Sequence, residues 1–86
     1  MKKIPQPGEQ VEIVDAGDRL PSVVESVAPA EEPGVFRIRV RVPRPIPRGE
    51  HVDLVTEEGV FHLAVHQSDE NMIELRAYEG MRPDQS

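Results

Sequence analysis

Cysteine and tryptophan are absent from this chain of 86 residues, and only three aromatic side chains are present, Phe36, Phe61 and Tyr78. Without cysteine, neither a disulfide bond nor a thiolate metal site can stabilise the fold. Both phenylalanines fall in alternating apolar patterns, so the chain lacks the row of exposed aromatic rings on which single-strand nucleic-acid binders stack bases. This lack, together with a formal net charge of −6, argues against nucleic acid as a partner.

Long apolar segments are also missing. No stretch approaches the ~20 apolar residues that cross a bilayer, and the lysines of MKKIPQPGEQ are followed by no apolar run. We therefore expect no membrane span, no signal peptide and a cytoplasmic location. The length predicts a single small domain over residues 1–86, with a thin core at about 7–77 and flexible tails at 1–6 and 79–86.

Helical periodicity does not survive anywhere, because nine prolines and six glycines are spread along the chain. The apolar period that recurs is two, which is typical of strands. It is clearest in GVFRIRVRV, where four apolar residues alternate with Val35 and three arginines, and it recurs in QVEIVD, RLPSVVESV, HVDLVT, GVFHLAVHQ and NMIELRA. A change of phase at Val23–Val24 predicts a bulge or a kink in the second of these runs, Arg19–Val27.

Six short strands joined by turn-rich connectors predict an all-β fold, a small six-stranded antiparallel split β-barrel. TEEG is short enough to close a hairpin between the fourth and fifth strands. Closure is favoured because it removes sheet edges that so small a domain could not cover. The side chains expected to be buried are Phe36, Ile38, Val40, Leu54, Phe61, Leu63, Val65, Ile73 and Leu75.

No recognisable catalytic or metal-binding pattern is present. His62 and His66 share a strand face but are ~13 Å apart at ~3.3 Å per residue, too far for one ion. His51 could approach one of them across a hairpin, but the sequence offers no third ligand. We expect no metal site, no cofactor, and outward-facing histidines that titrate near their ordinary range. Ser22 and Ser26 lack the glycine-flanked turn of a nucleophile. The chain is therefore interpreted as a non-enzyme.

Arginine, in contrast, is concentrated in one segment. VFRIRVRVPRPIPRG holds five of the ten basic side chains and none of the sixteen acidic ones. The five are Arg37, Arg39, Arg41, Arg44 and Arg48. The first three project from one strand face at ~6.6 Å spacing, and the other two follow in a loop that three prolines hold extended. Guanidinium groups bind oxyanions bidentately, so these arginines are the candidate binding site for an anion or an acidic partner surface.

The same arginines also fit an ordinary solvated strand. Glu12, Glu25 and Glu74 alternate out of their own strands and could form cross-strand ion pairs with them. Both interpretations stay open at this point. The loop pair, Arg44 and Arg48, is favoured as the contact pair because the proline-rich backbone presents it at little entropic cost.

The order of the motifs resembles one bacterial family. PGEQVEIVD, RLPSVVESV, a strand ending in proline, and IPRGEHVDLVTEEGVFHLAVHQS follow one another as in the N-terminal domain that precedes PilZ domains in flagellar-brake-type cyclic di-GMP receptors. The similarity runs over about Pro7–Ala77. It implies a non-catalytic split barrel that serves as the regulatory half of a cyclic di-GMP effector. The implied partner is an adjacent PilZ-type domain of a longer protein, or another protein.

The family's nucleotide-binding motifs do not carry over to this chain. RPIPR, Arg44–Arg48, has the R-x-x-x-R spacing but lies mid-chain, and Thr56–Gly59 has Leu54 where the family's Asp-x-Ser-x-x-Gly begins with aspartate. We therefore expect that this domain alone does not bind cyclic di-GMP. Two alternatives remain: a free-standing SH3-, Tudor- or KOW-like barrel that binds a protein or nucleic-acid ligand, and a subunit that completes its barrel against a partner. Only Tyr78 offers the first alternative an exposed aromatic ring.

Overall fold

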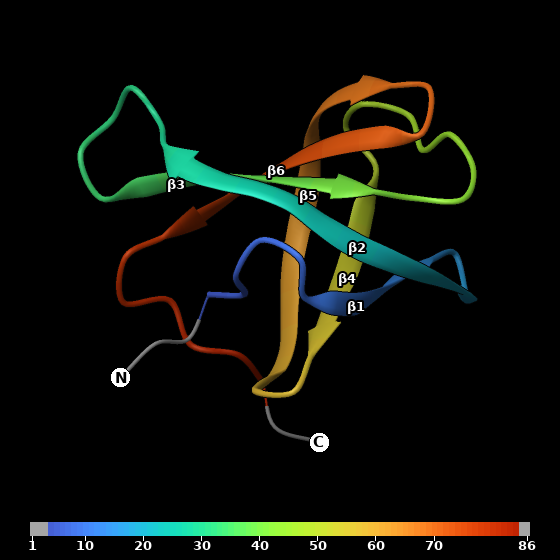
Figure 1. Ribbon diagram of the computed structural model, residues 1–86, viewed down its shortest axis with the longest axis horizontal. Helices are drawn as coiled ribbons and strands as arrows, with labels where there is room; N and C mark the ends of the chain where they lie inside the picture. The colour runs from blue at the N-terminus through green and yellow to red at the C-terminus, as the bar shows by residue number, and fades with distance from the viewer. Residues whose placement is uncertain (1–3, 85–86) are drawn as a thin grey trace.

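The computed structural model describes residues 4–84, which form six strands and no helix. The strands are β1 (Gln10–Asp15), β2 (Asp18–Pro29), β3 (Val35–Arg41), β4 (His51–Thr56), β5 (Gly59–Asp69) and β6 (Met72–Tyr78). All neighbours are antiparallel in the order β1-β2-β3-β6-β5-β4, and pairing of β4 with β1 closes the barrel (Figure 1). The predicted six-stranded antiparallel barrel is confirmed. Within residues 4–84 there is no helix of the length and apolarity that crossing a membrane requires.

Two-residue hairpins join β1 to β2, β4 to β5 and β5 to β6, and they set the register of five strands. Asp15 pairs with Asp18 across a two-residue turn in which Ala16 and Gly17 both have positive φ, 53° and 86°. Such turns match the right-handed twist of the strands that they join. Thr56 pairs with Gly59 across the second turn, as TEEG predicts.

The core is made of the inward-facing side chains of all six strands. Every side chain that the alternation predicts to be buried is buried, except Phe36. Ile46, which the sequence analysis did not assign to the core, inserts into it from the loop between β3 and β4 and is fully buried. The proline-rich loop is therefore anchored to the barrel by an apolar side chain.

The burial predicted at the start of β3 is wrong for two residues. Phe36 is only partly buried, whereas Val35, assigned to the outer face with the arginines, is buried. Phe36 pairs with Ala77 near the end of the β3–β6 ladder, but the β5–β6 ladder already stops at Leu75. This end of β3 therefore extends beyond the closed part of the sheet, where alternation no longer decides burial.

Two irregularities bend the barrel. The register shifts between Val24 and Ser26 in β2, which confirms the bulge expected in this strand, and between Val65 and Gln67 in β5. The β5–β6 register ends at the Val65–Leu75 pair, so residues 61–63 of β5 and 77–78 of β6 are not paired with each other. We call this opening the seam.

The predicted tails lie partly outside the described residues, which exclude 1–3 and 85–86. Ile4 and Met81 pack against the core. After β6 the chain returns to β5, where Asp84 forms an isolated antiparallel bridge with Val60.

Candidate functional site

The outer face of β3 carries the first three predicted binding residues. Arg37 is opposite Arg76 of β6, Arg39 is opposite Glu74, and Arg41 is opposite Met72. The strand therefore presents three arginines to a neighbour that supplies one carboxylate.

Of the three carboxylates considered as cross-strand partners, only one forms an ion pair with an arginine of β3. Glu25 bonds Arg41 at 3.3 Å, with both side chains exposed. Glu12 instead bonds Arg19 at 2.8 Å, and Glu74 bonds Arg76 at 3.0 Å. Arg37 and Arg39 thus have no ion pair among residues 4–84.

Arg37 is in an unfavourable electrostatic position. It directly faces Arg76, and like charges opposite each other destabilise a strand pair. Arg76 is compensated by Glu74 at 3.0 Å and by Glu31 at 3.6 Å. The Nε atom of Arg37 is buried without a hydrogen-bond partner within the described residues. Arg37 therefore faces a like charge and also has a buried N–H donor without an acceptor within the described residues.

The loop arginines have different surroundings from each other. Arg44 Nη2 lies 3.2 Å from Asp15 and 3.1 Å from Asp18, at the β1–β2 hairpin. Arg48 is exposed, and no ion pair of Arg48 occurs in the described part of the chain; the next residue, Gly49, donates its N–H to Val65 of β5. The structure thus does not place the two as a matched contact pair. Whether either binds a ligand stays a prediction.

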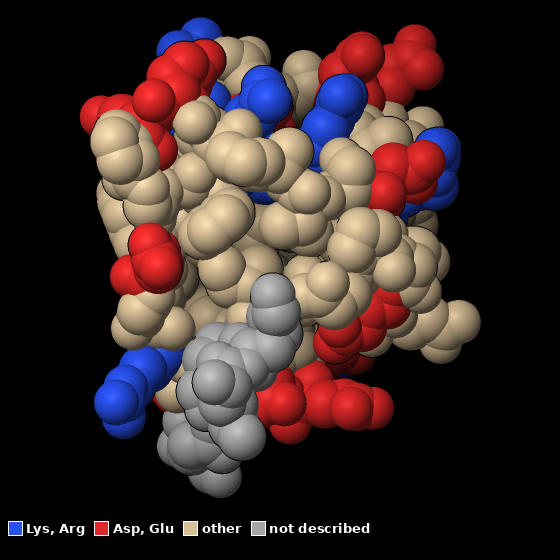
Figure 2. Space-filling model, turned by 60° about the vertical axis from the view of Figure 1, so that its left-hand side comes forward, with Lys and Arg blue, Asp and Glu red and all other residues tan. Residues whose placement is uncertain are grey.

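The surface seen in Figure 2 carries charges of both signs around an uncharged centre. Lysine and arginine side chains gather mainly along its upper rim, where acidic side chains stand between them. On this side, basic groups do not merge into one continuous area. A partner that recognises arginines would meet individual guanidinium groups.

The histidines are exposed, as predicted, but the prediction that all three titrate near the ordinary range is wrong for His62. Its Nδ1 lies 2.7 Å from Asp53 and its Nε2 lies 2.7 Å from Asp84. Hydrogen bonds to Asp53 and then Asp84 raise the pKa of His62 above 6.5. Sequence reasoning missed this because Asp84 lies far away along the chain.

His62 and its two carboxylates do not make a metal site. Asp53 and Asp84 bond opposite nitrogens of one ring, so their oxygens do not converge on a common point. Over residues 4–84, no three histidine, cysteine or acidic side chains are grouped so that they could hold an ion. The expectation of no metal and no cofactor stays a prediction.

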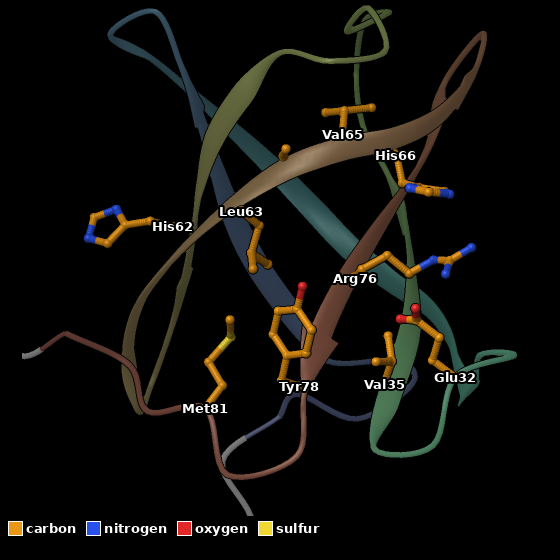
Figure 3. A pocket seen from close by; sticks show the side chains of 10 residues that line it. Glu32, Val35, His62, Leu63, Val65, His66, Arg76, Tyr78 and Met81 are labelled. Atoms are coloured by element: carbon orange, nitrogen blue, oxygen red, sulfur yellow. The ribbon is translucent and has the colours of Figure 1, made fainter.

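The seam contains a cavity of about 360 Å³ that the sequence did not reveal. Figure 3 shows Leu63, Tyr78 and Met81 pointing toward one another, from β5, β6 and the segment after β6. Arg76 and His66 lie on one side of the cavity, and His62 points away on the other. Tyr78, the aromatic residue left over from the strand pattern, is 57 % exposed here. In the sequence, the only signal for this place is an aromatic residue that the apolar faces of the strands do not use.

Glu31 shows how the cations near the seam act on a carboxylate. Its side chain is 81 % exposed. A hydrogen bond within its own backbone segment, followed by Arg76, Arg37 and His66, lowers the pKa of Glu31 below 4.5. Arg76, Arg37 and His66 therefore all favour a negative charge at this place.

A comparison of the chain with models of known families, with curated proteins and with solved structures finds no match.

Proposed function

We propose that the chain is a non-catalytic β-barrel domain that binds an acidic surface of a partner protein through β3. The observation that carries this proposal is the position of Arg37, which faces Arg76 and lacks an ion pair of its own within residues 4–84. Arg39 stands beside it, and its cross-strand carboxylate, Glu74, is held by Arg76.

A partner carboxylate would relieve this arrangement. It would offset the repulsion between Arg37 and Arg76 and accept hydrogen bonds from guanidinium donors, which bind carboxylates in a fork geometry. We therefore assign the main contacts with the partner to Arg37 and Arg39. Arg41, Arg44 and Arg48 remain in the predicted site, and we expect them to contribute less to binding. Arg41 and Arg44 already have acidic partners.

Two side chains of types that often act in catalysis, His62 and Ser22, are engaged in other contacts, which is compatible with a binding function. Both ring nitrogens of His62 bond carboxylates, so neither is available as a base. Ser22 is buried and donates its hydroxyl to the carbonyl oxygen of Leu20. Nucleophilic catalysis would require an exposed serine beside an available base.

In its finer form, the proposal identifies the partner as an adjacent PilZ-type domain of a bacterial, cytoplasmic cyclic di-GMP effector. The support is the order of strand motifs over about Pro7–Ala77 and the barrel into which they fold. The regulatory half would then transmit a signal by contact and leave nucleotide binding to its neighbour. A reading frame that continues into a PilZ-type domain, and tight association of the two separately expressed domains, are the expected findings.

The test of the binding face uses the ¹⁵N-labelled chain and an octapeptide of aspartate and glutamate as the acidic probe. Arg37→Gln with Arg39→Gln should abolish the shifts of the β3 resonances. Arg19→Gln with Arg82→Gln removes the same charge elsewhere and should leave those shifts in place. Equal loss in both double variants would show that net charge alone attracts the probe, and the proposal would then be wrong.

A further inference from the structure

The segment that follows β6, residues 79–84, returns to β5 along the lower end of the cavity in Figure 3. We call this segment the strap. At its start, the N–H of Glu79 donates to the carbonyl oxygen of Gly34 at 2.7 Å. At its end, Asp84 and Val60 exchange two backbone hydrogen bonds, of 2.7 and 2.9 Å. The strap is therefore attached to the barrel at both ends.

The strap closes one end of the seam. At the other end, the β5–β6 ladder begins with the Val65–Leu75 pair and continues to the hairpin that joins the two strands. The strap, in contrast, meets β5 in a single bridge at Val60. One border of the seam is thus held by a continuous ladder and the other by an isolated bridge, so the strap is the border that can move.

Met81 holds the middle of the strap against the barrel. Its side chain packs against the core and lines the cavity together with Leu63 and Tyr78 (Figure 3). Met81 is only partly buried, so it contributes less to stability than a methionine inside the core. A segment with so few buried apolar contacts opens more readily than the strands around it.

His62 provides a further attachment of the strap, and this one depends on a proton. The Nδ1 atom of His62 lies 2.7 Å from Asp53 of β4, and its Nε2 atom lies 2.7 Å from Asp84 of the strap. A neutral imidazole carries one N–H, whereas the protonated ring carries two. Only the protonated ring can therefore donate to both carboxylates and connect the strap to β4.

The charged groups that act on His62 come from β4 and from the strap. Hydrogen bonds to Asp53 and then to Asp84 raise the pKa of His62 above 6.5. The other charged or titratable side chains of β4, β5 and the strap are His51, His66, Asp69, Glu79 and Arg82. The raised pKa of His62 comes from Asp53 and Asp84 and from none of these groups. The double contact is thus complete below pH 6.5 and is lost as the pH rises through the raised value.

We propose that the strap is a pH-sensitive closure of the seam: protonated His62 holds Asp84 against the barrel, and loss of the second ring proton loosens the strap. Loosening moves Met81 away from the core and widens the entrance to the cavity of about 360 Å³. This device uses neither Arg37 nor Arg39, so it exists whether or not the β3 face binds a partner.

Hydrogen exchange on the ¹⁵N-labelled chain measures how often the strap opens. The amides of Val60 and Asp84 exchange when the bridge between them breaks. Their protection factors should fall about two- to fivefold as the pH rises through the pKa of His62, because an exposed ion pair is lost. The amides of Ile38 and Leu75, which pair in the β3–β6 ladder, should keep their protection.

Three variants at exposed side chains separate the strap from other causes of pH dependence. His62→Gln cannot be protonated, so below pH 6.5 the two bridge amides should show the lower protection that the parent has at high pH. Asp84→Asn should have the same effect. His66→Gln is the matched control, because it removes another exposed histidine of β5 that forms no ion pair within residues 4–84. It should keep the pH dependence of the parent.

Constant protection of the bridge amides across the pKa of His62 would overturn the proposal, and so would a pH dependence that persists in His62→Gln. An equal loss of protection in the β3–β6 ladder would also overturn it, because the whole barrel would then be opening. The ¹³C-methyl signal of Met81 tests the effect on the cavity. It should shift with the same midpoint as the bridge amides, while that of Met72, at the far end of β6, stays constant. A constant Met81 signal would refute the widening of the cavity.

Discussion

Arg44 Nη2 lies 3.2 Å from Oδ2 of Asp15, whose side chain is only 7 % exposed. The other oxygen of Asp15, Oδ1, is buried and has no hydrogen-bond partner within the described residues. Arg44 also contacts Asp18. A buried carboxylate needs a counterion, so Arg44 stabilises the β1–β2 hairpin in addition to any contact that it makes with a partner.

Replacing Arg44 by alanine should lower the free energy of unfolding by about 1–3 kcal/mol, because the Asp15 carboxylate would remain buried without its counterion. Arg48→Ala, which breaks no ion pair within residues 4–84, should stay within about 0.5 kcal/mol of the parent. Urea unfolding measures both. Asp15→Asn should recover part of the loss in the Arg44→Ala background. Equal, small effects of both arginine variants would contradict the structural role.

The contacts of His62 predict a pH dependence. Protonated His62 donates one N–H to Asp53 and one to Asp84, whereas the neutral ring has a single proton. Because the folded-state pKa is raised above 6.5, this stabilisation is complete below pH 6.5 and is lost as the pH rises through the raised value.

An NMR titration of the His62 ring protons measures that pKa, and exchange protection factors of the Val60 and Asp84 amides report whether the returning segment loosens above it. Asp84→Asn should lower the pKa of His62. An unchanged pKa in that variant would show that Asp84 does not hold the ring.

The two phenylalanines should differ in their contribution to stability. Phe61 is 2 % exposed and lies within the core, so Phe61→Ala should cost about 3–5 kcal/mol. This is a large part of the stability of so small a domain. Phe36→Ala should cost less than about 2 kcal/mol, because Phe36 is only partly buried. Thermal unfolding followed by circular dichroism separates the two values. Similar losses would place Phe36 in the core after all.

Cyclic di-GMP should not bind to this domain alone. In the R-x-x-x-R spacing of RPIPR, Arg44 is engaged by two carboxylates. Leu54, which stands where the family motif has aspartate, is fully buried and cannot contact a ligand. Isothermal titration should show no heat of binding. A micromolar dissociation constant would contradict this prediction and would make Arg44 and Arg48 the favoured contact residues again.

The sequence by itself determined the six strands, the TEEG hairpin and about half of the buried core. Side chains alternate between the two faces of a strand, so a local period of two is enough to separate inward from outward positions. That local rule held for Ile38 and Val40, inside the closed sheet, and failed for Val35 and Phe36, beyond its end.

Only the tertiary structure decided which charges pair and where the barrel opens. Glu74 lies opposite Arg39 yet bonds Arg76, and the carboxylates that hold His62 and Arg44 come from other strands or from the end of the chain. The seam exists because the β5–β6 ladder stops at Val65 and Leu75. These features depend on contacts between residues far apart in the chain, which strand register and sheet twist determine and local alternation does not encode.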